Sequence, residues 1–212
     1  MIKFFLLFLL IGIYSCGKNT AKKKINPKVD ALASKIIPLV RFIDNPDSCR
    51  KALSFLDSAT MIDNKCFLCY QNKLMFLFSL KRYDKAIQTN DTLISLAPNA
   101  HDLYLTGGIL CEANKDTVSS MKYFRKCLSI CNSVLDTMNR SNRDYTMLAS
   151  NKAICMIMLG DQMKANDVLK KLYDTEPNDS VFGNVTKDGI QLLMNKTRGD
   201  LIKSLLNPSD NN

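Results

Sequence analysis

The sequence contains no tryptophan, a single histidine, and few turn-forming residues, with 8 glycines and 6 prolines in 212 residues. Scarce glycine and proline argue against an all-β fold, which needs a turn after every short strand. The lone His101 excludes centres with several histidine ligands and leaves little general-base chemistry near neutral pH. Glycine-rich phosphate loops, HExxH and GxSxG motifs are also missing. We therefore expect no enzyme activity, no cofactor, no metal ion and no small-molecule substrate.

The composition that remains is that of a folded globular chain, with 46% apolar and 23% charged residues. A formal charge of +9 would by itself indicate a nucleic-acid or membrane partner. Six of the 29 basic residues, however, lie in residues 1–29, where there is no acidic residue, and the other 23 are opposed by 20 acidic residues. The basic excess thus belongs mainly to the N-terminal segment, and we expect no nucleic-acid binding.

Residues 1–15 are organised like a signal peptide, with a short positive region at Lys3 followed by an apolar run from Phe4 to Ile13. A membrane-spanning helix needs about 20 apolar residues, so a run of about ten is too short to cross a bilayer. Ile13-Tyr14-Ser15-Cys16 resembles the lipobox of bacterial lipoproteins, although Tyr14 is bulkier than usual at its position. An ordinary signal peptide or an uncleaved apolar N-terminus is the alternative.

The lipobox resemblance implies cleavage before Cys16 and acyl chains on Cys16, which would anchor the protein in the bacterial envelope. Gly17, and the lack of acidic residues before Asp30, favour the outer membrane and its periplasmic face. Residues 16–29 contain five lysines and are expected to form a tether. The tether is either a solvated spacer, which we favour, or a polybasic contact with anionic lipid.

A period of 34 residues organises the rest of the chain. The small residues Ala52, Ala86 and Ser120 recur at this spacing, and Ala165 follows after 45 residues. Other series share the register: Leu56, Asn90 and Phe124; Ala59, Leu93 and Cys127; Tyr70 and Tyr104; Leu74 and Gly108. Apolar residues also recur at helical spacing within each copy, which predicts one pair of helices per copy.

This pattern resembles the tetratricopeptide repeat (TPR), most clearly from Tyr83-Asp84-Lys85-Ala86 through Leu96-Ala97-Pro98-Asn99. The resemblance implies an all-α fold, a right-handed α-solenoid of about four TPR-like hairpins over residues 30–179. Residues 180–212 would form a C-terminal capping helix and tail. The match is degenerate, because Leu74 replaces a small residue and Asn90 an aromatic one. A helical bundle without repeats is the alternative.

The spacing also predicts individual elements. The longer interval before the fourth copy predicts a lengthened hairpin with helices at about 117–139 and 143–159. Apolar residues from 187 to 206 predict one terminal helix that covers the last face of the stack. Predicted N-caps are Asp116 and Asp161, and predicted helix stops are Pro98 and Pro177.

The TPR resemblance implies a concave, partner-binding groove lined by the first helix of each pair. Its projected positions are Leu68, Gln71, Met75 and Phe78, then Asp102, Leu105, Ile109 and Glu112, then Met147, Ser150, Ile154 and Ile157. They are largely apolar and lack a Lys/Asn carboxylate clamp, so we expect an amphipathic helix or an extended apolar peptide as ligand. Two interpretations stay open. The groove is open to a partner, or it is filled in cis by the terminal helix or by Ile36–Ile37.

Cysteine is the one unusual residue type, with seven besides Cys16. Cys66-Phe67-Leu68-Cys69 has the spacing of a redox motif or of half a zinc site, at a predicted helix start that can depress a thiol pKa. Since no second CxxC follows, an inert pair or a local disulfide is favoured. Three further cysteines fall at positions expected to be buried: Cys111, Cys127 and Cys155.

The sequence therefore predicts a membrane-anchored interaction scaffold of the bacterial envelope that binds a protein or peptide and has no chemistry of its own. The alternative is a thiol-redox or metal-binding envelope protein that uses Cys66 and Cys69. A repeat fold supports many such roles, so the fold does not identify the partner.

Overall fold

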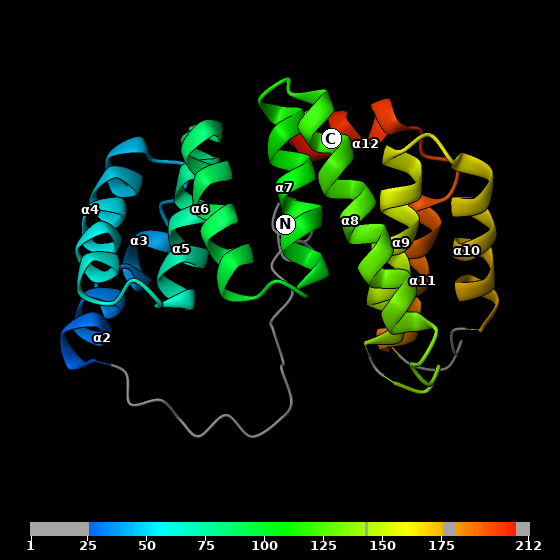
Figure 1. Cartoon of the computed structure of the whole chain (residues 1–212), viewed down its shortest axis with the longest axis horizontal. Helices are drawn as coiled ribbons and strands as arrows, with labels where there is room; N and C mark the ends of the chain where they lie inside the picture. The colour runs from blue at the N-terminus through cyan, green and yellow to red at the C-terminus, as the bar shows by residue number, and fades with distance from the viewer. Residues whose placement is uncertain (1–25, 143, 176–180, 207–212) are drawn as a thin grey trace. The chain divides into compact units, whose positions relative to one another are not determined.

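The computed structural model describes residues 26–142, 144–175 and 181–206, and within them every regular element is a helix (Figure 1). The all-α prediction is thereby confirmed. The leader, Cys16 and most of the expected tether lie outside the described residues. None of the helices described is both long and apolar enough to cross a bilayer.

The chain divides into two compact units, with the boundary after Pro98. Their described parts are residues 26–98 and residues 99–206. The sequence had predicted one repeat domain over residues 30–179 without this division.

The first unit consists of two short helices followed by three longer ones. They are α2 (Pro27–Ser34), α3 (Ile37–Val40), α4 (Pro46–Ile62), α5 (Phe67–Ser79) and α6 (Tyr83–Leu96). Helices α2 and α3 pack against α4, α4 packs against α5, and α5 packs against α6. Short connections join α4 to α5 and α5 to α6, so α5 and α6 form a helix hairpin (Figure 1).

Helix α2 begins inside the segment that the sequence assigned to the tether. The Asn26 side chain accepts a hydrogen bond from the Lys28 amide, and Pro27 occupies the first turn, where its missing N–H costs nothing. Val29 is buried. The expected tether of residues 16–29 is therefore too long, because its last residues already belong to the fold.

The second unit contains two helix hairpins and two further helices. They are α7 (His101–Ala113), α8 (Thr117–Leu135), α9 (Tyr145–Met158), α10 (Gln162–Thr175), α11 (Val181–Leu193) and α12 (Arg198–Leu206). Each helix from α7 to α10 packs against the next one along the chain, and α12 packs across α7 and α9.

The small residues that marked the 34-residue period are buried where the helices of a pair meet. Ala52, Ala86, Ser120 and Ala165 are all inaccessible to solvent. Gly108 shows how close the helices come, because a Cβ atom at this position would lie 2.5 Å from the ring of Phe124. The period therefore reports the close approach of paired helices.

The lengthened hairpin is confirmed for its first helix alone. Helix α8 has 19 residues against 14 in α6, but it ends at Leu135 rather than at about 139. Helix α9 has 14 residues and begins at Tyr145 rather than at 143. The side chains of Asn139 and Asn142 accept hydrogen bonds from the amides of residues 141 and 144. Such Asx turns compete with helical bonds and so end the helix early.

The single terminal helix predicted for residues 187–206 is wrong, because the segment forms α11 and α12 with a break at residues 194–197. Asn195 adopts a positive φ of 63°. Thr197 and Asp200 then form a capping box, in which Asp200 accepts from the Thr197 amide at 2.9 Å and Thr197 Oγ1 accepts from the Asp200 amide at 3.2 Å.

The predicted helix ends mostly agree with the structure. Asp116 caps α8 by accepting a hydrogen bond from the Ser119 amide at 3.0 Å. Asp161 directly precedes α10, and its carboxylate contacts the Lys164 ammonium at 2.8 Å. Pro98 follows α6 closely, whereas Pro177 lies outside the described residues.

Candidate functional site

In the first unit, the projected groove positions form one face of α5. Leu68, Gln71, Met75 and Phe78 are three or four residues apart, which places them along a single helix face. We call these four residues the α5 face. Leu68 is 56% exposed and the other three are half-buried. The ring of Phe78 meets the ring of Tyr83 edge to face at 5.8 Å.

In the second unit, the equivalent positions are covered by α12. Leu105 and Ile109 of α7 and Ile157 of α9 are almost fully buried, in one core that includes Leu201 of α12. Ile154 packs against the same core, and Met147 is half-buried. In this unit the chain's own terminal segment therefore occupies the groove positions.

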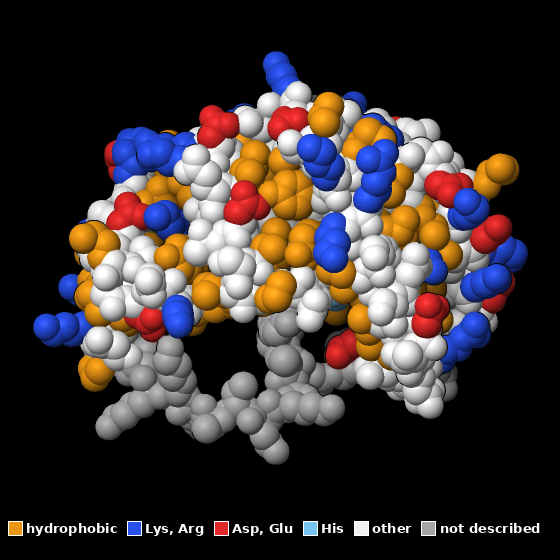
Figure 2. Space-filling view, viewed as in Figure 1, with side chains coloured by type: hydrophobic (Ala, Val, Ile, Leu, Met, Phe, Trp, Pro, Cys, Tyr) orange, Lys and Arg blue, Asp and Glu red, His pale blue; other side chains and the backbone are white. Residues whose placement is uncertain are grey.

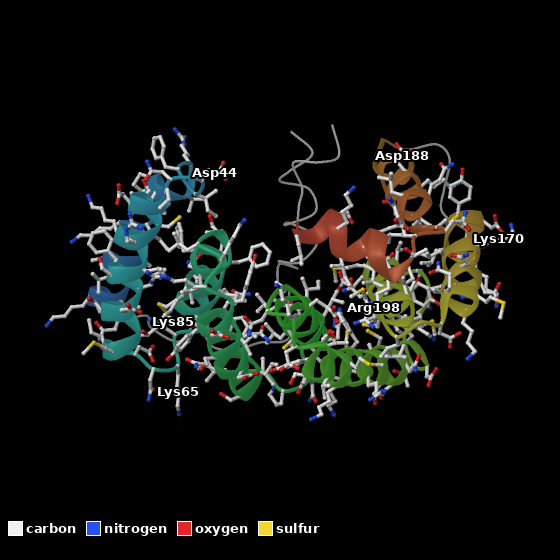
Figure 3. The ribbon with its side chains drawn as sticks, turned by 90° about the horizontal axis from the view of Figure 1, so that it is seen from above. Asp44, Lys65, Lys85, Lys170, Asp188 and Arg198 are labelled. Carbon is white, nitrogen blue, oxygen red and sulfur yellow. A yellow bond between two sulfur atoms is a disulfide. The ribbon has the colours of Figure 1, made fainter. Side chains whose placement is uncertain are left out.

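A partly buried ion pair lies at the start of α12. The guanidinium of Arg198, which is labelled in Figure 3, contacts the carboxylate of Glu112 at 2.5 Å. The Glu112 side chain is 8% exposed. Glu112 was a projected groove residue, but Arg198 was not foreseen. No local signal could have revealed Arg198, because the pair joins residues 86 positions apart.

The other segment considered for filling the groove, Ile36–Ile37, is divided between the interior and the solvent. Ile36 is buried, whereas Ile37 is 68% exposed. Helices α2 and α3 pack mainly against α4. The chain just after α3 reaches the end of α5, where the Ser79 hydroxyl donates a hydrogen bond to the Ile43 carbonyl, whereas Leu68 in the first turn of α5 stays exposed.

Cys66 and Cys69 are joined by a disulfide at the start of α5. Cys66 is the N-cap residue, and its sulfur accepts a hydrogen bond from the Cys69 amide at 3.3 Å. Cys66 is half-buried, while Cys69 is inaccessible. No group of three or more His, Cys, Asp or Glu side chains suited to a metal ion occurs in the part of the chain that the structure describes.

The remaining described cysteines are free thiols in the interior: Cys49, Cys111, Cys127, Cys131 and Cys155. The sulfurs of Cys127 and Cys131 lie 3.9 Å apart on successive turns of α8. The hydrogen bond with Cys127, together with burial, raises the pKa of the Cys131 thiol far above its usual value. Cys131 is thus protonated and unreactive at neutral pH.

His101 and Asp102 begin α7 as a largely buried pair. Burial lowers the pKa of His101 below 6.5, an effect that the charge of Asp102 opposes. Burial likewise raises the pKa of Asp102 above 3.8, opposed by the charge of His101. Within the described residues, neither His101 Nε2 nor Asp102 Oδ1 has a hydrogen-bond partner. The charge of Asp102 also acts on the Cys127 and Cys131 thiols and helps to raise their pKa values.

No family model matches the sequence, and no curated protein matches it significantly. Among solved structures, the chain is similar to PilW, a widely conserved type IV pilus biogenesis factor, with a TM-score of 0.50 and 18% identity over 87% of this chain and 89% of that chain.

A second similar structure consists of nearly identical TPR-like repeats from a putative kinesin light chain of Podospora anserina. Its TM-score is 0.53, with 12% identity over 85% of this chain and 98% of that chain. YrrB, a TPR protein with an unusual peptide-binding site, aligns with a TM-score of 0.44 and 14% identity over 87% of this chain and 94% of that chain. Paired helices at a 34-residue period agree with the likeness to the TPR-like repeats of the kinesin light chain: the chain has the fold of the tetratricopeptide-repeat proteins.

Proposed function

We propose that this protein is an interaction scaffold that binds a helical segment of a partner protein on the α5 face. The observation that carries the proposal is a contrast between equivalent positions. Gln71 and Met75 lie 34 residues before Leu105 and Ile109, which α12 covers, yet on α5 both are only half-buried and the neighbouring Leu68 is exposed. An amphipathic helix laid on α5 would bury this apolar surface, as α12 does on α7.

Helix α12 indicates what kind of helix fits such a face. It contributes the buried Leu201 and the half-buried Ile202 to the core and places Arg198 on Glu112. On α5, the residue 34 positions before Glu112 is Phe78, which offers no carboxylate. We therefore expect the partner helix to present an apolar residue at this end, where α12 presents a cation.

Anchoring in the bacterial envelope is the second part of the proposal. The lipobox-like sequence ending at Cys16 and the five lysines that follow it support a lipid-anchored protein, at the outer membrane and facing the periplasm. On the face seen in Figure 2, Lys and Arg side chains are interspersed with Asp and Glu, which favours a protein partner over a nucleic acid. A Cys16→Ser chain should leave the membrane fraction and lose its acyl mass.

The binding proposal is tested by photo-crosslinking in the native cells. A photoreactive amino acid replaces Leu68 in one chain and Met163 in a control chain, because both side chains are exposed and apolar but only Leu68 belongs to the α5 face. Position 68 should capture a specific protein that position 163 does not. The purified partner should then bind Leu68→Asp at least about tenfold more weakly than it binds the wild-type chain. A tenfold rise in Kd corresponds to a loss of about 1.4 kcal/mol of binding free energy.

The Met163→Asp chain is the matched control and should bind the partner as the wild type does. Circular dichroism should show that both variants keep their helix content, since both replace exposed side chains. Equal binding by Leu68→Asp and wild type would place the partner elsewhere and contradict the proposal.

A further inference from the structure

We propose that the Cys66–Cys69 disulfide is a thiol–disulfide exchange site that accepts two electrons from a dithiol on another protein. The inference starts from the asymmetry of the two sulfurs. Cys66 lies half-buried at the helix N-cap, so an incoming thiolate can reach it, whereas Cys69 is 1% exposed and inaccessible. Exchange needs one accessible sulfur for attack and one protected sulfur that leaves and later closes the ring again.

The start of α5 also stabilises the reduced form. The Cys69 amide already donates a hydrogen bond to Cys66 Sγ. A thiolate on Cys66 would accept this bond and interact favourably with the positive end of the helix dipole. We therefore expect the Cys66 thiol of the reduced chain to have a pKa below the ordinary value of about 8.5.

A purely structural role explains this disulfide poorly. Its two cysteines are three residues apart within the first turn of one helix, so the bond ties no distant segments together. A cross-link that closes so short a loop constrains the unfolded chain less than a long-range one. The free thiols described elsewhere in the chain are all buried. Among the described cysteines, the accessible sulfur is therefore that of Cys66 in this disulfide.

The surroundings of the disulfide suit a protein substrate. Three exposed apolar side chains lie near the pair in sequence: Met61 and Ile62 at the end of α4 precede it, and Leu68 in the first turn of α5 lies between the two cysteines. We call these three residues the apolar collar. Lys65, labelled in Figure 3 at the α4–α5 turn, adds one exposed cation. An extended segment with apolar residues beside its cysteines would contact this collar.

The reaction balances in two steps. A thiolate of the partner attacks Cys66 Sγ, a partner–Cys66 disulfide forms, the Cys66–Cys69 bond breaks, and Cys69 leaves as a thiolate that takes up a proton. The partner's second thiol loses its proton and attacks its own sulfur in the mixed disulfide, which releases Cys66 as a thiolate. The partner dithiol thereby loses two electrons and two protons, and the Cys66/Cys69 pair gains them.

The test uses variants of the full chain in which one cysteine of the pair is replaced, with oxidised glutathione as the probe. Cys69→Ser leaves the accessible Cys66 thiol, and Cys66→Ser leaves the inaccessible Cys69 thiol. Because Lys65 and Lys73 flank the pair, trypsin releases residues 66–73 as one peptide, whose glutathione adduct is counted by mass spectrometry. We expect Cys69→Ser to be modified at least tenfold faster than Cys66→Ser, with a pH profile that places the Cys66 pKa below about 8.5.

In the wild-type chain, dithiothreitol should reduce the pair while circular dichroism shows that the helices stay folded. Equal, slow modification of the two variants would overturn the proposal, as would a disulfide that resists dithiothreitol until the protein unfolds. A reduced pair that retains zinc would also overturn it in favour of metal binding. The glutathione rates are measured without any protein partner, so failure of the helix-docking proposal is distinguishable from failure of this one.

Discussion

Individual buried positions decide how closely the helices of a pair approach. Gly108 on α7 faces Phe124 on α8, and the Phe124 ring is inaccessible to solvent and enclosed by the core. A methyl group at position 108 would lie 2.5 Å from this ring, well inside van der Waals contact. The ring cannot move aside cheaply, because protein interiors are packed as densely as organic crystals.

Gly108→Ala should therefore lower the free energy of unfolding by about 1–3 kcal/mol, the usual cost of overpacking a core. The gain in helix propensity from replacing glycine is smaller than this clash. Urea unfolding followed by circular dichroism measures the change.

Gly189→Ala provides the control, because a Cβ at position 189 of α11 meets nothing within 4 Å. This variant should be more stable than the wild type by about 0.5–1 kcal/mol. If both variants changed the free energy of unfolding alike, the contact with Phe124 would not be the cause of the loss in Gly108→Ala.

The buried carboxylate of Asp102 should make stability depend on pH. Burial raises its pKa above 3.8, so the folded state binds this proton more tightly than the unfolded state does. The stability that this group contributes is therefore largest below pH 3.8 and is lost as the pH rises through the folded-state pKa. His101 works in the opposite direction, because its lowered pKa disfavours the folded state as the pH falls below 6.5.

Asp102→Asn removes the first of these effects. The variant should exceed the wild type in free energy of unfolding by about 1 kcal/mol at pH 8, and this advantage should shrink as the pH approaches 4. Urea titrations at several pH values measure the difference. Asp167→Asn replaces an exposed carboxylate on α10 and should follow the wild type throughout; an advantage of Asp102→Asn that did not change with pH would contradict the assignment.

At the scale of elements, α12 is held by one end through charge and along its length by apolar contact. Glu112 is nearly buried, so its carboxylate depends on Arg198 for compensation. Leu201 and Ile202 then contribute to the core that contains Leu105 and Ile109. Losing the cation should affect α12 more than any other helix of the unit.

Arg198→Ala should lower the free energy of unfolding by about 1–3 kcal/mol, because it leaves a desolvated carboxylate unpaired. Hydrogen exchange should rise first at the amides of α12. Lys164→Ala breaks the exposed pair with Asp161 and should leave the free energy of unfolding almost unchanged. The exchanged pair Glu112→Arg with Arg198→Glu should recover part of the loss; no recovery would mean that the contact acts through packing alone.

The sequence predicted those elements whose signals are local. Ala52, Ala86 and Ser120 set the register of the hairpins, and Asp116 marked the start of α8, because burial and capping act within one or two helical turns. The break before α12 also had a local signal, the capping box of Thr197 and Asp200, which the continuous apolar pattern concealed.

Contacts between distant segments had no such signal. The pairing of Arg198 with Glu112, and therefore the closure of the second unit's groove by α12, depends on how α11 and α12 turn at Asn195. The exposure of the α5 face likewise follows from the absence of an α12-like helix in the first unit's described residues. Tertiary packing decided both features, and a pattern of apolar residues cannot distinguish a covered helix face from an open one.

At the scale of the whole molecule, the division after Pro98 gives each unit its own buried residues. Phe76 and Leu93 lie in the first unit, and Phe124 and Leu169 in the second. Residues that share one cluster of buried contacts unfold together. We therefore expect each unit to open independently of the other in hydrogen exchange.

Native-state hydrogen exchange followed by mass spectrometry should therefore give one set of opening free energies for residues 27–96 and another for residues 101–206. Gly108→Ala should lower the second set and leave the first unchanged within about 0.5 kcal/mol. A uniform decrease across both would show that the chain unfolds as one cooperative body.

Phe78 on α5 and Glu112 on α7 occupy equivalent positions of the repeat, and their different chemistry affects whether copies of this chain associate with one another. An open helix face on one copy and a helix of the right shape on the next are the parts of a head-to-tail filament, because such contacts do not close on themselves. Were α12 of one copy to lie on the α5 face of another, its Arg198 guanidinium would lie at Phe78 and would lose the Glu112 carboxylate that it contacts within its own chain. Arg198 thus stabilises α12 within its own chain and disfavours binding of α12 to the α5 face of another copy. We therefore expect the chain to stay monomeric while its α5 face remains open.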